Sequence, residues 1–132
     1  MPGLVTQIRR MYADIADHGG DFGDGVEHGE FDPFAVAAAP GLAPFERVGA
    51  AVAVLCRLMC AIDNGGHAWV AAEYGPRVRE LLWAGALDHE PLVRTAAEAF
   101  FASEAAFVAA LRPVYEGVVR RWAADVASGA AG

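Results

Sequence analysis

The sequence predicts an all-α protein, a single compact bundle of five to seven helices around one buried central helix. Apolar residues recur at helical spacing along most of the 132 residues, and no stretch shows the strict alternation typical of a strand. The hydrophobic content of 55% is sufficient for a folded core, and the length suits one domain. We therefore expect residues 1–132 to form a single helical domain.

The segment Pro44–Val70 is expected to organise this fold. Its first proline suits the start of a helix, and from residue 48 to residue 62 the only charged side chain is Arg57. A helix that is apolar on most of its circumference is buried on most sides. The uninterrupted apolar run, Val48–Cys56, is shorter than the roughly 20 residues that cross a bilayer, so we expect a core helix and not a membrane span.

An Asn-Gly-Gly tripeptide at 64–66 is expected to end the central helix, with its first or second residue in the left-handed conformation. A short helix should restart at His67. Gly75-Pro76 should break it, and a further helix should run from Pro76 to Ala84.

The C-terminal part predicts two further helices. Asp88 is expected to cap a helix from Glu90 to Ala102, and Ser103 either caps a new helix or lies within a continuous one. The last helix should reach Ala127, with a kink or break near Arg112 that Pro113 imposes. The expected inner faces are Leu92, Ala96, Ala99 and Phe100 in the first helix, and Phe107, Leu111, Val114, Tyr115, Val118, Val119, Trp122 and Val126 in the second.

The N-terminal part predicts an amphipathic helix at Leu4–Asp17, an acidic glycine-rich loop at 18–30, and a short helix that starts at Asp32-Pro33 and ends near Ala39. Residues 128–132 should form a flexible tail.

The net charge of −7 is concentrated in one window. Between Met11 and Glu46 the chain has eight acids and no Arg or Lys, so the rest of the chain carries +1. Proteins that bind nucleic acid directly present a basic patch, and this chain shows the opposite. The candidate partner-binding residues are Asp14, Asp17, Asp21, Asp24, Glu27, Glu30 and Asp32.

No cofactor or metal site is expected. The acidic loop fits a solvated mobile segment, a partner-binding face, or a metal site with His18 and His28, but its acids do not follow the EF-hand register. Cys56 and Cys60 lie four residues apart on one helix, as two small buried hydrophobes or a redox pair. The three tryptophans are expected in the core or at its partly exposed edge.

Catalytic motifs are absent from the sequence: it has no serine elbow, phosphate-binding loop or dinucleotide-binding glycine pattern. An alternative remains at Asp63 and His67, where an orienting carboxylate and a base could act together beside a helix end. The competing interpretation is structural, because Asn64 closes one helix and His67 starts the next.

The central segment resembles an all-helical DNA-mimic-protein family with an Asn-Gly-Gly signature, over about residues 42–127. The matching positions are Arg47, Asn64, Gly65, Gly66 and Trp69. Family members usually place an aromatic after the glycines, where this chain has His67. The resemblance implies a helical bundle whose acidic surface imitates nucleic acid and occupies the basic face of a partner; some members are thought to neutralise toxins.

The leading functional expectation is a non-enzymatic acidic module that binds a basic protein surface, either a nucleic-acid-binding protein or a toxin. The alternatives are a toxin-neutralising inhibitor that relies on shape more than charge, and a small-ligand-binding or enzymatic domain with its site near Asp63–His67. The N-terminal stretch lacks the long apolar run of a signal peptide, which favours a cytoplasmic protein.

Overall fold

The computed structural model describes residues 33–121, and within that range it contains helices and turns but no strand. Its elements are α3 (Pro33–Ala38), α4 (Pro44–Gly65), α5 (His67–Trp83), α6 (Pro91–Phe100), α7 (Glu104–Val114) and a π-helical turn, η1 (Tyr115–Val119). The all-α prediction is confirmed. The expected helix at Leu4–Asp17, the acidic loop and the tail lie outside the described residues.

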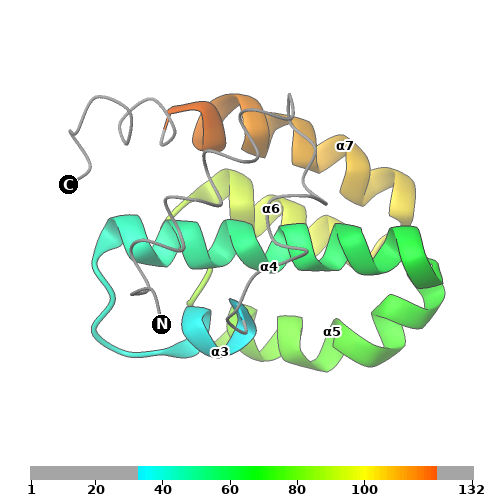
Figure 1. The fold of residues 1–132 in the computed structure, drawn as a ribbon, viewed down its shortest axis with the longest axis horizontal. Helices are drawn as coiled ribbons and strands as arrows, with labels where there is room; N and C mark the ends of the chain where they lie inside the picture. Colours follow the sequence, from blue (N-terminus) through cyan, green and yellow to red (C-terminus); the bar gives the residue numbers. More distant parts are fainter. Residues whose placement is uncertain (1–32, 122–132) are drawn as a thin grey trace.

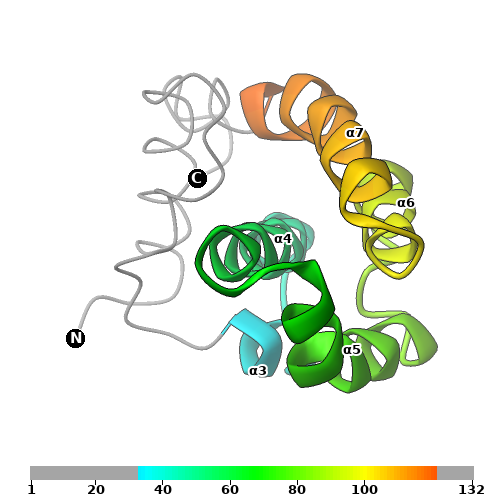
Figure 2. The ribbon, with the colours of Figure 1, turned by 90° about the vertical axis from the view of Figure 1, so that its right-hand side faces the viewer.

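Helix α4 is the central element, as expected. It contacts α3, α5 and α6, and seen end-on it has α3 and α5 on one side and α6 and α7 on another (Figure 2). Every residue from Val48 to Cys56 is buried. The core that surrounds this run also takes Val70 and Val78 from α5, and Phe100 and Phe107 from α6 and α7.

By length and composition alone, one stretch of α4 could cross a membrane. It is Arg47–Gly65, with a mean hydropathy of 1.5, and no second such stretch occurs in residues 33–121. Within the bundle, 61% of that window is buried against other parts of the protein. The core helix of a globular bundle meets the same criteria, so the apolar character of α4 is accounted for by its neighbours.

The turn between α4 and α5 is made by one glycine. Gly66 has φ 85° and ψ 154°, a conformation that is essentially restricted to glycine. The expectation that Asn64 or Gly65 takes a left-handed conformation is wrong, because both remain helical and α4 ends only at Gly65. The two helices then lie side by side along the molecule (Figure 1).

Helix α5 is continuous, so the predicted break at Gly75-Pro76 is wrong. Pro76 is exposed, while Val70, Gly75, Val78 and Leu81 are buried on both sides of it. Burial of this apolar face along the whole helix offsets the loss of the backbone hydrogen bond that the proline cannot make. Gly75 also lacks the Cβ that normally clashes with a following proline in a helix.

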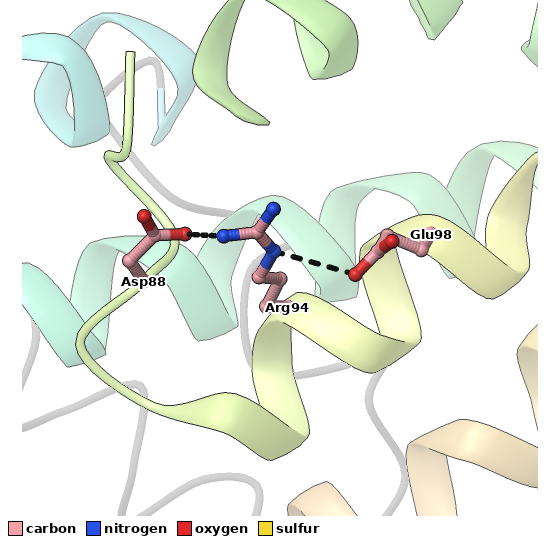
Figure 3. Close-up of polar contacts among 3 residues, drawn as sticks. All are labelled: Asp88, Arg94 and Glu98. Atoms are coloured by element: carbon pink, nitrogen blue, oxygen red, sulfur yellow. Dashed lines mark hydrogen bonds and ion pairs between the residues drawn. The ribbon is translucent and has the colours of Figure 1, made fainter. Parts of the chain in front are cut away.

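Asp88 does not cap α6, contrary to prediction. The helix starts at Pro91 with Glu90 at the cap position and no side-chain cap, and it ends at Phe100. Asp88 Oδ1 instead pairs with Arg94 Nη1 at 2.6 Å, and Glu98 Oε1 accepts from Arg94 Nε at 3.4 Å (Figure 3). Of the expected inner face, Ala96 and Phe100 are buried and Leu92 and Ala99 are half-buried, while Val93 and Ala97 complete the buried face.

Helix α7 begins at Glu104 and continues past its proline. Ser103 Oγ accepts from the backbone N–H of Ala106 at 3.0 Å, so of the two alternatives left open by the sequence, Ser103 caps a new helix. The predicted break near Arg112 is wrong: α7 runs to Val114 although Pro113 has no N–H to donate, and η1 follows directly. Of the predicted stripe, the members within the described residues are buried or half-buried: Phe107, Leu111, Val114, Tyr115, Val118 and Val119.

Candidate functional site: a pocket beside the corner between α4 and α5

The residues proposed from the sequence for partner binding fall outside the described part of the chain. They are Asp14, Asp17, Asp21, Asp24, Glu27, Glu30 and Asp32. The residues of the Asn-Gly-Gly signature are all described, and four of the five meet at the end of α4. Arg47 is at the other end of that helix, about 25 Å away at 1.5 Å per residue, so it belongs to no common site with them.

The signature residues form a compact helix end. Asn64 Nδ2 donates to the backbone carbonyl oxygen of Cys60 at 2.9 Å, one turn earlier in α4. Gly65 lies directly under the indole of Trp69: a Cβ on this glycine would be only 2.7 Å from Trp69 Cε3. Gly66 then makes the turn. The contact with Trp69 therefore explains why position 65 is a glycine, and the turn between α4 and α5 explains why position 66 is one.

A row of aromatic rings extends from Trp69 towards α3. Trp69 and Tyr74 meet edge to face, with ring centroids 6.3 Å apart and planes at 82°. Tyr74 stacks on Phe34 at 5.5 Å, and the Arg77 guanidinium lies 4.4 Å from the centre of the Phe34 ring. Trp69 is held by its neighbours although 51% of it is exposed.

A pocket of about 550 Å³ opens beside this row. Its wall on α4 is one helical face, because its residues are spaced three, four and seven apart, and its wall on α5 is aromatic. The described lining residues are Arg57, Cys60, Ala61, Asn64, Gly65, Trp69 and Tyr74.

Arg57 is the one charged residue among those described in the wall. It is half-buried, and none of the ion pairs within residues 33–121 includes it. The pocket therefore combines a cation with a mostly apolar surface. Sequence reasoning noted Arg57 as the only charge in an apolar helix but did not connect it to a site.

His67 and Asp63, the alternative site from the sequence, lie close to this pocket along the chain but do not line it. His67 Nε2 is 2.7 Å from the carbonyl oxygen of Phe100, which can only accept, so this nitrogen carries the hydrogen and donates. Phe100 is the last residue of α6, and His67 thus satisfies a helix-terminal carbonyl from a neighbouring helix. Asp63 is exposed.

The cysteines and the remaining tryptophans differ in how far they are buried. Cys56 is buried and Cys60 is half-buried in the pocket wall. Trp83 is 92% exposed, so the expectation of a core or edge position is wrong for this residue; Trp122 lies outside the described residues. Within residues 33–121 no three His, Cys, Asp or Glu side chains come together as a metal would require.

No family model, curated protein or solved structure matches this chain.

Proposed function

We propose that the protein is a non-enzymatic binding module that docks its acidic N-terminal region on the basic surface of a partner protein. In the DNA-mimic form of this proposal, it blocks a surface that the partner uses for nucleic acid. The observation that carries the proposal is the unequal division of charge along the chain.

The described bundle is nearly neutral. Residues 33–121 contain nine acids and eight arginines, whereas residues 1–32 contain seven acids and two arginines. Several carboxylates of the bundle are already paired, Asp88 and Glu98 with Arg94, and Glu90 with Arg121 at 3.1 Å. The excess negative charge is thus carried by the segment that precedes the bundle.

A charge-based interface has a characteristic salt dependence. Attraction between exposed charges accelerates association and is screened over about 8–10 Å near physiological ionic strength. We therefore expect partner binding to weaken strongly as salt is raised. A toxin-neutralising inhibitor that uses shape would bind with little dependence on salt.

The test compares two variants, each of which replaces four carboxylates with amides and so loses the same negative charge. One carries Asn at Asp14, Asp17, Asp21 and Asp24. The control replaces Asp63, Glu73, Glu80 and Glu116 with the corresponding amides; all four are exposed, and none forms an ion pair within residues 33–121. Circular dichroism melts establish that both variants fold.

Each protein is then used to capture partners from lysate at low and high salt, with duplex DNA as competitor. We expect the wild type and the control to retain a DNA-binding protein that duplex DNA releases, and the N-terminal variant to lose it. Equal capture by both variants would overturn the proposal. Capture that resists salt would favour the inhibitor.

A further inference from the structure

The pocket beside the corner between α4 and α5 has the composition of a site for a small organic anion. Ligand pockets in proteins typically have volumes of about 300–1,000 Å³ and are mostly apolar, with a few polar groups that fix orientation. This pocket, at about 550 Å³, is lined by Ala61, Trp69 and Tyr74 together with Arg57 and Asn64.

Arg57 gives the pocket its charge preference. A guanidinium that is partly removed from water gains from a charged hydrogen-bond partner, and carboxylates match its planar fork with two parallel hydrogen bonds. The described residues supply no carboxylate to this wall and no ion pair to this arginine. A bound anion would fill that role.

Trp69 and Tyr74 give the pocket its preference for a flat apolar body. Their planes are nearly perpendicular, so together they offer both a ring face and a ring edge. Trp69 is positioned in advance, because its indole rests on Gly65, where a side chain would collide with it. Ordering an exposed aromatic before binding reduces the entropy cost of binding.

We propose that this pocket binds a small monocarboxylate with a flat apolar body. The carboxylate pairs with Arg57, and the body lies against Trp69 and Tyr74. Neither His67 nor Asp63 is among the described residues that line the pocket.

The first experiment uses the wild-type chain with 2-naphthoate and its neutral isostere 2-naphthamide. Isothermal titration calorimetry gives the affinities, and the NMR signal of the Trp69 indole N–H, assigned with Trp69→Phe, locates binding. We expect naphthoate to bind saturably to one site. Its affinity should be about tenfold or more higher than that of naphthamide, because a hydrogen bond to a charged group contributes about 1.5–3 kcal/mol. No saturable binding, or equal affinities, would overturn the proposal.

The second experiment removes the cation. Arg57→Gln should lower the affinity for naphthoate to that for naphthamide and leave naphthamide unchanged. Arg112→Gln is the matched control, because Arg112 is exposed on α7 and does not line the pocket. A tenfold preference for naphthoate that persists in Arg57→Gln would place the anion elsewhere and overturn the assignment.

Discussion

The indole of Trp69 occupies the space that a side chain on Gly65 would need. A Cβ on Gly65 would lie 2.7 Å from Trp69 Cε3 and 3.2 Å from Cζ3, closer than carbon atoms approach without displacement. Gly65 is the last residue of α4 and Trp69 lies in the first turn of α5, so their contact joins the two helices at the corner. It also sets the aromatic wall of the pocket.

This contact predicts that the effect of Gly65→Ala depends on Trp69. In a helix, Gly→Ala normally stabilises by about 0.5–1 kcal/mol, but forcing atoms into an occupied space costs about 1–3 kcal/mol. We expect Gly65→Ala to lower the free energy of unfolding in the wild type and to leave it equal or higher in a Trp69→Ala background. Urea denaturation of the four proteins measures the coupling, and additive effects would show that the residues do not interact.

Substitution of Gly66 should destabilise the fold for a different reason. Nothing lies within 4 Å of the position of a Cβ on this residue, so space is not limiting, but φ 85° and ψ 154° are unfavourable for any other residue. We expect Gly66→Ala to cost about 1–3 kcal/mol. Unlike the effect of Gly65→Ala, this loss should be the same with or without Trp69, and urea denaturation in both backgrounds tests it.

His67 is expected to stabilise the fold and to play no part in ligand binding. His67→Ala removes the donor to the Phe100 carbonyl and the edge-to-face contact between the two rings, whose centroids are 5.4 Å apart. An unsatisfied, partly buried carbonyl costs about 1–3 kcal/mol. His89→Ala, at an exposed position, is the control and should change stability by less than about 0.5 kcal/mol. Thermal melts compare the two, and equal effects would contradict the assigned role.

Arg94 should contribute little to stability despite its two ion pairs. The side chains of Arg94, Asp88 and Glu98 are 47%, 45% and 59% exposed, and exposed pairs typically contribute at most about 1 kcal/mol. We expect Arg94→Gln to lower the free energy of unfolding by less than about 1 kcal/mol at low salt, with a smaller loss at high salt. A larger, salt-independent loss would mean that the network orders the turn before α6.

Several features of the fold could be predicted because they depend on neighbouring residues. Pro44 and the apolar run that follows fixed the start and burial of α4, and Ser103 was one of two alternatives for the start of α7. The predictions at Pro76 and Asp88 failed because each considered a local backbone preference without the side-chain contacts that compete with it. Burial of both halves of α5 outweighs the proline, and Arg94 competes for the Asp88 carboxylate.

The candidate site could be predicted only in part from the sequence. The sequence pointed to the corner at Asn64, Gly65 and Gly66, but it assigned the chemistry to His67 and Asp63. Arg57 joins the pocket because it is two helical turns before Asn64 on the same face of α4, and Tyr74 joins it because α5 remains helical to that point. The spacing of Arg57 and Asn64 can be read from the sequence, but the approach of Tyr74 on α5 to this face requires the path of the helices in space.

By itself, the sequence determined that this chain is helical, that its central helix is apolar and that its negative charge lies near the N-terminus, because periodicity and composition are local properties. Only the tertiary structure decided which tryptophan rests on a glycine and which is exposed, where His67 donates, and that Arg57 faces an aromatic wall. Those outcomes depend on the turn at Gly66 and on the packing of whole helices, which set the distances between side chains on different helices.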